Sequence, residues 1–321
     1  MMLDVDDLKV FFYTRNGAVK AVDGISFSID RGETLGIVGE SGCGKTTTGL
    51  ALLNIIPKPG KITEGSIMLD GMDITKLDEN RMRKEVRWKK ISMVFQGSMN
   101  CLTPTYTIGK QMVETIAYHT EMEKKEALEI AKKYLAHVGL KEDVVKRYPH
   151  ELSGGMKQRA VIATALLLEP ELVICDEPTT ALDVIVQTQI INLLKKLKRE
   201  LGLSYIFITH DLSIEAEVAD RLAVMYAGRI VEMGTNAQIY GKKPLHPYTQ
   251  KLLGATPRLR EKMDELDFIP GVPPDLLSPP EGCRFHPRCP YATAVCRKKE
   301  PELIDAGEGH RVACWLVEGR A

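Results

Sequence analysis

Residues 39–46 read GESGCGKT, which fits the phosphate-binding pattern G-x-x-x-x-G-K-[ST]. In this pattern the glycines let backbone N–H groups turn inward around a phosphate, and the helix that follows adds positive partial charge at its N-terminus. The lysine reaches the outer phosphates and the threonine hydroxyl binds Mg²⁺. An apolar stretch at 35–38 and a helical stretch at 47–53 flank the segment, as the pattern requires. The expected nucleotide-binding residues are Gly39, Glu40, Ser41, Gly42, Cys43, Gly44, Lys45, Thr46 and Thr47, with Thr46 as a Mg²⁺ ligand and Cys43 as a tolerated small residue.

Two adjacent carboxylates close a strand-like run at residues 172–177, LVICDE. A buried strand that ends in acids directs them into the crevice where α/β folds bind ligands. Asp176 is placed to hold Mg²⁺, directly or through water, and Glu177 is the candidate general base that activates the attacking water. Beside the phosphate-binding segment, this pair predicts Mg²⁺-dependent hydrolysis of a nucleoside triphosphate.

A second anion-binding helix start lies at residues 152–159, LSGGMKQR. The segment contains Ser153, Gly154 and Gly155 just before a helical stretch at 156–168, and none of these residues is a lysine. An anion would therefore be bound only by backbone N–H groups and by the positive partial charge of the helix N-terminus. The same residues can also serve only as an N-cap with flexible glycines. One chain has little use for two phosphate cradles on one nucleotide, whereas a dimer can grip the nucleotide from both sides. We therefore expect this segment to contact the nucleotide of a partner chain.

The elements that must position these residues alternate between strand-like and helix-like patterns over the first 235 residues. Short apolar runs rich in β-branched residues predict buried parallel strands at 33–38, 91–94, 172–175, 205–208 and 222–225. Apolar residues recur at helical spacing between these runs, for example at 127–138 and 190–201. The alternation predicts an α/β sheet covered by helices. Together with the phosphate-binding segment, it indicates an α/β fold that resembles the P-loop NTPase (RecA-like) core.

Two further parts are expected beside this core. Residues 8–13, 25–29 and 62–74 alternate apolar and polar side chains, which predicts an antiparallel β subdomain. Residues 105–152 carry helical patterns and no strand-like run, which predicts a helical insertion.

Composition excludes several classes of protein. The 321 residues contain 43 Lys and Arg and 43 Asp and Glu, so the net charge is zero, and attraction to bulk nucleic acid or anionic lipid is not built into the overall charge. The longest apolar stretch, at 160–168, is too short to span a bilayer. The acidic N-terminus shows no secretory signal. We expect a soluble chain without a transmembrane segment and no nucleic-acid partner.

The order and spacing of these motifs resemble those of ATP-binding cassette (ABC) ATPases, whose signature is LSGG followed by Gln and Arg. The resemblance implies that Gln96 is the glutamine that touches Mg²⁺ and joins the core to the helical insertion. Asp183, in Ala-Leu-Asp, resembles the loop that meets the opposite subunit, and His210 resembles the histidine that contacts the terminal phosphate. Either Phe12 or Tyr13 resembles the aromatic residue that stacks on adenine.

The resemblance covers about residues 1–240 and implies a division of the chain. A nucleotide-binding domain is expected at 1–240, with its helical subdomain at about 97–155, and a loop-rich tail is expected at 241–321.

Four of the seven cysteines lie in the last 39 residues, at Cys283, Cys289, Cys296 and Cys314. Ten of the 17 prolines lie at 242–290, so regular structure should be scarce and a metal held by four thiolates would supply the missing order. Zinc sites usually pair cysteines two to four residues apart, whereas the gaps here are 5, 6 and 17 residues, which favours an iron–sulfur cluster over Zn²⁺. Free or disulfide-linked thiols are the third alternative.

The segment HPYT at residues 246–249 resembles one found in ATPase subunits of bacterial dipeptide and oligopeptide importers, and nickel and glutathione importers of the same group share it. The segment also reads as the start of a helix that caps the core. Peptide-importer subunits with a similar tail carry a [4Fe–4S] cluster, so the resemblance implies the same cluster at the four cysteines. The tail is therefore expected to be stapled by metal.

The resemblance implies an ATPase that powers the import of di- or oligopeptides, with nickel, glutathione or another small solute as the alternative. It implies a head-to-tail dimer with a second ATPase subunit, usually a distinct sister chain, at the cytoplasmic face of the cell membrane. Two transmembrane permease subunits and, indirectly, an external substrate-binding protein complete the expected partners. DNA-repair ABC ATPases insert long coiled coils between their motif halves, translation factors carry two cassettes, and exporters lack this tail, so these classes are not favoured.

Overall fold

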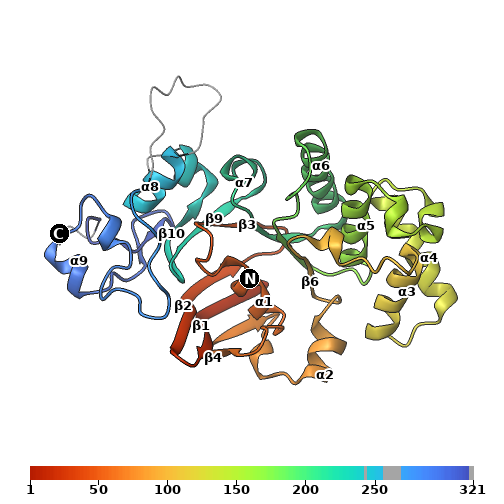
Figure 1. Ribbon diagram of the computed structural model, residues 1–321, viewed down its shortest axis with the longest axis horizontal. Coiled ribbons are helices and arrows are strands. Elements are labelled where there is room, and N and C mark those ends of the chain that lie inside the picture. The colour runs from red at the N-terminus through yellow and green to blue at the C-terminus, as the bar shows by residue number, and fades with distance from the viewer. Residues whose placement is uncertain (242–243, 256–268, 318–321) are drawn as a thin grey trace. The chain divides into compact units, whose positions relative to one another are not determined.

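The computed structural model describes residues 1–241, 244–255 and 269–317, which fall into two compact units (Figure 1). The first unit comprises Met1–Ile29, Thr34–Thr75 and Ile208–Ala321, and the second comprises Asp30–Glu33 and Lys76–Phe207. None of the helices in the described ranges combines the length and apolar character needed to cross a bilayer.

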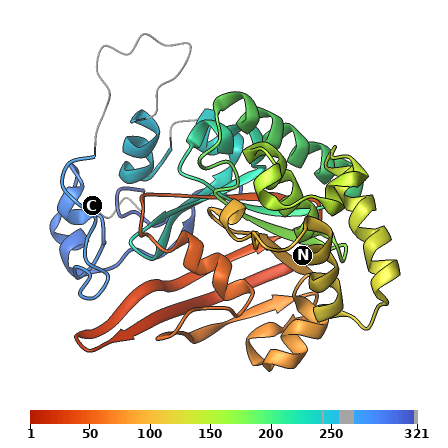
Figure 2. The same cartoon turned by 45° about the vertical axis from the view of Figure 1, so that its right-hand side comes forward.

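The first unit contains an antiparallel sheet with the strand order β2-β1-β4-β5. Its strands are β1 (Leu3–Thr14), β2 (Gly17–Ile29), β4 (Gly60–Leu69) and β5 (Met72–Asp73), and Figure 2 shows β1 and β2 as a long red ribbon. The buried residues of β1 change from odd to even positions after Val5, because the pairing shifts register before Leu8. The predicted antiparallel β subdomain is confirmed.

A second sheet of the first unit carries the strand that leads into the phosphate-binding segment. β3 (Thr34–Val38) pairs in parallel with β9 (Arg221–Tyr226), and every residue of β3 is buried. β10 (Arg229–Thr235), β12 (Arg311–Val312) and β11 (Ile304–Asp305) extend the sheet beyond β9 in antiparallel pairs. These three strands are absent from the sequence prediction.

The helices of the first unit are short. They are α1 (Lys45–Leu52), α7 (Leu212–Val218), α8 (Pro247–Gly254) and α9 (Ala294–Lys298), together with the helical turns η1 (Ile74–Lys76), η6 (Ala237–Gly241) and η7 (His286–Arg288). α8 begins at the HPYT segment with the His246 side chain as its N-cap, which confirms the expected helix start.

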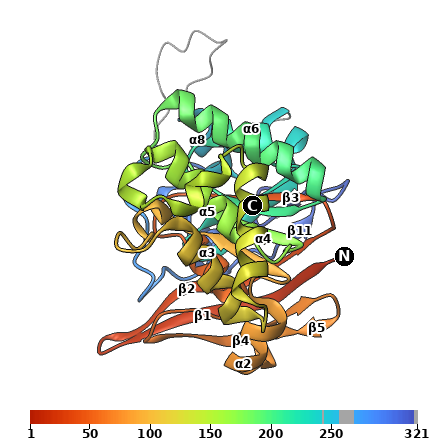
Figure 3. The ribbon, with the colours of Figure 1, turned by 90° about the vertical axis from the view of Figure 1, so that its right-hand side faces the viewer.

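The second unit holds three predicted strands and most of the long helices (Figure 3). Its strands, in the order β8-β7-β6, are β8 (Ser204–Ile208), β7 (Leu172–Asp176) and β6 (Ile91–Val94). Its helices are α2 (Glu79–Arg81), α3 (Ile108–His119), α4 (Lys124–His137), α5 (Gly154–Leu166) and α6 (Val184–Leu201), with the short turns η2 (Met82–Val86), η3 (Ser98–Asn100), η4 (Glu142–Lys146) and η5 (Pro149–Glu151). The stretch from 105 to 152 contains helices and no strand, as predicted.

The described part of the tail packs into an apolar core, a source of order that the sequence analysis did not predict. Tyr248, Leu253 and Phe285 pack into one hydrophobic cluster with core residues such as Val224 and Tyr226. Three aromatic rings of this cluster lie 4.6 to 5.4 Å apart, centroid to centroid. Burial of apolar surface therefore contributes to the order of the described part of the tail.

Candidate functional site

Residues 39–46 form the loop between β3 and α1 in the first unit. Two of its positions accept only glycine. A Cβ on Gly39 would lie 2.1 Å from the carbonyl oxygen of Met225, and a Cβ on Gly44 would lie 2.2 Å from the carbonyl oxygen of Ala21. Both glycines also have positive φ angles, 151° and 106°, which side chains disfavour. The loop is therefore closed tightly by its neighbouring strands.

Lys45 lies inside this loop. Its ammonium donates to the carbonyl oxygens of Gly39, at 2.7 Å, and Glu40, at 3.0 Å, and the residue is buried. Thr46 follows at the exposed start of α1. A cation surrounded by a glycine loop and followed by a helix N-terminus suits a polyphosphate.

Cys43 is buried beside Lys45, with its Sγ 3.8 Å from the ammonium. Burial raises the pKa of the thiol above its usual value, an effect that the nearby ammonium only partly offsets. The thiol is thus protonated at neutral pH, as expected of a small packing residue rather than a reactive thiolate.

The two candidate adenine-stacking residues differ in their surroundings. The Tyr13 side chain is 45% exposed, with the Lys61 ammonium 4.8 Å from its ring centroid. The Phe12 ring packs against Gly60, where an added Cβ would lie 2.6 Å from the ring. The Tyr13 ring is thus partly exposed to solvent, whereas the Phe12 ring packs against the chain at Gly60.

His210 is an exposed residue directly before α7. The next residue, Asp211, caps that helix by accepting hydrogen bonds from the N–H groups of Ser213, at 2.9 Å, and Ile214, at 3.3 Å. This N-cap orders the backbone at Asp211, directly after His210.

In the second unit, the structure brings Gln96 and Glu177 together. β6 and β7 pair in parallel with Val94 opposite Cys175, so the two residues that follow each strand emerge at the same edge. The Gln96 amide donates to the Glu177 carboxylate at 2.8 Å, and the Thr180 hydroxyl donates to the same oxygen at 2.9 Å.

Asp176 and Glu177 stand in different surroundings although they are adjacent. Asp176 is the last residue of β7 and is 1% exposed. Glu177 has a positive φ of 48°, an uncommon conformation for a residue with a side chain. The backbone thus turns sharply after the strand, and the Glu177 side chain reaches the exposed amide of Gln96.

The starts of α5 and α6 also lie together in the second unit. Ser153 caps α5 by accepting from the Met156 N–H at 3.4 Å, and Asp183 caps α6 by accepting from the Val186 N–H at 2.9 Å. A Cβ on Gly155 would lie 2.8 Å from Val186, so the two helix starts pack closely.

The surface beside these helix starts is unusually apolar. Val184 and Ile185, in the first turn of α6, are 77% and 72% exposed. Exposed branched aliphatic side chains of this kind are typical of a surface that another chain covers.

The predicted site residues divide between the two units. Residues 39–47, Tyr13 and His210 belong to the first unit, whereas Gln96, Asp176, Glu177, Ser153, Gly154, Gly155 and Asp183 belong to the second. Within the first unit, the structure places Lys45 inside the glycine loop. Within the second, it joins Gln96 to Glu177 and the helix start at Ser153 to that at Asp183.

The four tail cysteines line one small cavity of the first unit. They come from separate turns, and the Cys283 N–H donates to the Cys296 carbonyl at 2.8 Å. Burial raises the pKa of Cys283 to about 12 and that of Cys314 to about 11. All four are free thiols, and across the described ranges no three or more His, Cys, Asp or Glu side chains are grouped as a site for a metal ion.

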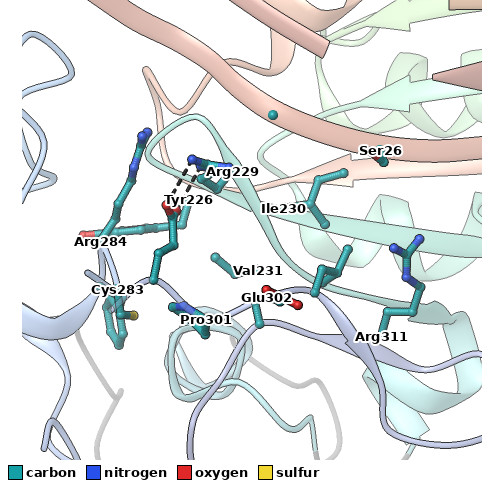
Figure 4. A pocket seen from close by; sticks show the side chains of 15 residues that line it. Ser26, Tyr226, Arg229, Ile230, Val231, Cys283, Arg284, Pro301, Glu302 and Arg311 are labelled. Carbon is teal, nitrogen blue, oxygen red and sulfur yellow. Dashed lines mark hydrogen bonds and ion pairs between the residues drawn. The ribbon is translucent and has the colours of Figure 1, made fainter. Parts of the chain in front are cut away.

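A larger cavity of 380 Å³ lies between β10 and the tail (Figure 4). Two arginines on its wall are already paired: Arg229 with Glu300, at 3.0 Å, and Arg284 with the buried Asp23. The cavity adjoins the cysteines, because Cys283 lines both.

Sequence reasoning missed two residues that touch the glycine loop. Arg288 forms a two-pronged ion pair with Glu40, and the Tyr248 hydroxyl accepts from the Glu40 N–H. Tyr248 lies in the recognised HPYT segment, but no signal in the sequence linked it or Arg288 to residues 39–46.

Comparisons with known proteins agree with this geometry. Residues 22–180 match the ABC transporter family and residues 231–296 match the oligopeptide/dipeptide transporter, C-terminal region. A dimeric ATP-binding cassette, solved in a post-hydrolysis state with ADP and phosphate, aligns with 73% of this chain and 99% of its own, at a TM-score of 0.65 and 28% identity. Fold and sequence therefore define an ABC-type ATPase with the P-loop NTPase fold.

Similar proteins narrow the family further. The chain is 46% identical to the dipeptide transport ATP-binding protein DppD of Bacillus subtilis, over 100% of this chain and 96% of that protein. It is also 46% identical to the oligopeptide transport ATP-binding protein OppD of Escherichia coli, over 98% and 93% respectively. The chain belongs to the family of ATP-binding subunits of dipeptide and oligopeptide ABC transporters.

Proposed function

We propose that the chain hydrolyses ATP to power the import of di- or oligopeptides, as a peripheral subunit on the cytoplasmic side of the membrane. The observation that carries this proposal is similarity over the whole length, tail included, to proteins named for dipeptide and oligopeptide transport. Nickel and glutathione are the competing cargoes.

Uptake measurements test the cargo. Cells that lack this chain should take up a radiolabelled dipeptide poorly, and the wild-type chain should restore uptake whereas Lys45→Ala should not. Uptake of ⁶³Ni²⁺ and of labelled glutathione is measured in the same cells. Restoration of nickel or glutathione uptake, with no effect on the peptide, would contradict the proposed cargo.

Each residue of the ATP site has a proposed role. Lys45 and the N–H groups of residues 39–47 bind the phosphates, and His210 contacts the terminal one. Bound Mg²⁺ supplies positive charge to the phosphates, and Thr46, Gln96 and Asp176 carry the oxygen ligands that such an ion prefers. Glu177 accepts the proton of the attacking water, and the Gln96 amide, 2.8 Å away, orients its carboxylate.

Tyr13 is the proposed adenine-stacking residue. Its ring is partly exposed to solvent, whereas the Phe12 ring packs on Gly60. Tyr13→Ala should weaken ATP binding more than Tyr13→Phe, and an equal loss for both variants would rule against stacking.

A head-to-tail dimer completes the proposed site. Ser153, Gly154 and Gly155 of one subunit would contact the nucleotide held by the other, and Asp183 would lie at the same contact. The exposed Val184 and Ile185 beside these helix starts favour this arrangement. The partner is a second ATPase subunit, usually a distinct sister chain, and the pair would drive two membrane permeases that receive cargo from an external binding protein.

The proposed base is tested with Glu177→Gln, which keeps the shape of the side chain but removes its ability to accept the proton. ATP hydrolysis should fall by a factor of about 100 or more, while ATP still promotes dimerisation in size-exclusion chromatography. Wild-type turnover by this variant would refute the assignment.

The tail cysteines would hold a [4Fe–4S] cluster. Four thiols of one cavity are a donor set that such a cluster takes. Burial raises the pKa of Cys283 to about 12 and that of Cys314 to about 11, so binding through these two thiols would release protons. The gaps of 5, 6 and 17 residues between these cysteines favour a cluster over Zn²⁺, whose cysteine ligands usually lie two to four residues apart.

Anaerobic purification tests the cluster. The wild-type chain should be brown and contain about four iron and four sulfide per chain, and Cys289→Ser should lose both. Cys101→Ser, which removes an exposed cysteine elsewhere, is the matched control and should keep the cluster. A colourless wild-type protein with one zinc per chain would overturn the proposal.

A further inference from the structure

The second residue of the phosphate-binding loop, Glu40, is held from the tail by an ion pair. The Arg288 guanidinium donates through Nη1 to Oε2 at 2.6 Å and through Nη2 to Oε1 at 2.9 Å. This two-pronged geometry is the strongest that an arginine and a carboxylate can form. The Arg288 side chain is only 6% exposed, so water competes little for the pair.

The backbone of Glu40 is held from the tail as well. Its N–H donates to the Tyr248 hydroxyl at 2.9 Å. Tyr248 is fully buried, and its ring lies 4.6 Å from that of Tyr226 and 5.4 Å from that of Phe285, centroid to centroid. A ring packed in this way cannot swing aside, so its hydroxyl is a fixed acceptor for the loop.

Arg288 is itself immobilised. Its Nε donates to the Pro270 carbonyl at 2.8 Å, and its Nη1 lies 3.3 Å from the Tyr226 hydroxyl. On the other side of Glu40, the carbonyl of that residue accepts from the Lys45 ammonium at 3.0 Å. A continuous set of hydrogen bonds therefore runs from the tail through Glu40 to the loop lysine.

We propose that Arg288 and Tyr248 are positioning residues for ATP, which hold residues 39–46 in the phosphate-binding conformation through Glu40. Ordering a loop costs conformational entropy, and contacts that order it before the ligand arrives improve affinity. Neither residue needs to touch the nucleotide. The inference rests on the proposed phosphate site, and it gives the tail a role in ATP binding.

Titration with a fluorescent ATP analogue tests the proposal on the full-length chain. Glu40→Gln and Arg288→Met should each raise the dissociation constant about tenfold. Tyr248→Phe, which removes only the hydroxyl, should raise it about threefold. Arg297→Ala changes an exposed arginine of the same tail and should leave the constant unchanged.

A double-mutant cycle separates the ion pair from a general loss of structure. Because both single substitutions break the same pair, the Glu40→Gln, Arg288→Met double variant should bind ATP no more weakly than either single variant. Arg288→Lys, which keeps the positive charge but cannot form the two-pronged ion pair, should recover part of the affinity. In steady-state hydrolysis the KM for ATP should rise while kcat stays close to wild type, as expected when binding alone is weakened.

Two results would overturn the proposal: wild-type affinity in both single variants, or strictly additive losses in the double variant. Lys45→Ala shows which inference has failed. If that variant binds ATP as tightly as wild type, the proposed phosphate site is wrong. If it loses binding while Glu40→Gln and Arg288→Met keep it, only the positioning role is wrong.

Discussion

Glu215 in α7 has a carboxyl group buried without a partner, and this should make the stability of the first unit depend on pH. The residue is 0% exposed, and neither of its carboxyl oxygens has a hydrogen-bond partner among the described residues. Its carboxyl group lies beside Gly36 of β3, and Tyr240 is a neighbouring titratable group. Burial raises the pKa of Glu215 well above its ordinary value of 4.5.

The sign of the effect follows from proton counting. Between the unfolded and folded pKa values of Glu215, the folded chain keeps a proton that the unfolded chain has lost. The free energy of unfolding therefore falls as the pH rises, by about 1.4 kcal/mol per pH unit. From an unfolded pKa of 4.5, the loss in the free energy of unfolding at pH 7 is at most about 3 kcal/mol, and below pH 4.5 it vanishes.

Glu215→Met should remove this cost, because methionine fills a similar volume and does not ionise. Above pH 4.5 the variant's advantage over wild type should grow by about 1.4 kcal/mol per pH unit until the folded carboxyl ionises, which gives at most about 3 kcal/mol at pH 7. Glu215→Gln is the matched control: it should lose the pH dependence but gain less, since a buried amide without partners remains.

Urea unfolding at pH 5.5, 6.5 and 7.5 measures the effect. The chain has two tryptophans, Trp88 in the second unit and Trp315 in the first. In a Trp88→Phe background, the buried Trp315 reports on the first unit alone. A constant difference between wild type and Glu215→Met across the three pH values would refute the reasoning, as would a less stable variant at pH 7.5.

Three further substitutions probe single contacts. The fully buried Glu232 carboxylate accepts hydrogen bonds from the His310 ring and from two backbone N–H groups of the tail. Glu232→Gln should therefore destabilise the first unit by about 3 kcal/mol in the same Trp315 assay. Asp183→Ala should cost about 1 kcal/mol by removing the α6 N-cap, measured by urea unfolding of the second unit through Trp88 in a Trp315→Phe background, with Asp183→Asn expected to keep most of it. Tyr134→Phe should cost about 1 kcal/mol in that assay, because the Tyr134 hydroxyl donates to Glu169 at 2.9 Å; no loss would mean that water replaces this bond.

The residues that sequence reasoning identified depend on local backbone geometry. The glycines and Lys45 of residues 39–46 act through a single loop, and Ser153 and Asp183 each cap the helix that they begin. Such roles recur at fixed spacing, because the geometry is contained in a few consecutive residues. The predicted parallel strands were found for the same reason, since each is a short and mostly apolar run.

Two of the elements that were missed, β10 and α7, have a charged residue in a buried position. β10 was not recognised because Glu232 interrupts its apolar run, yet this side chain is 0% exposed and bonded to His310. Glu215 likewise makes this position of α7 look exposed in the sequence, although its side chain is buried in the structure. A charged residue normally lies at the surface. The sequence therefore does not show that Glu232 and Glu215 are buried, and only the structure does.

The support of the phosphate-binding loop could not be predicted for a different reason. Arg288 and Glu40 are 248 residues apart in the chain, and nothing in the sequence distinguishes Arg288 from the other arginines as the partner of Glu40. A motif constrains the residues that touch the ligand, but the geometry of those residues is set by contacts that any part of the chain can supply. Because Tyr248 and Arg288 both reach Glu40, and both lie outside the ABC transporter match, the tail belongs to the same cooperative structure as the loop. Truncation after residue 240 should therefore remove contacts of the ATP site itself, and not only a separate appendage.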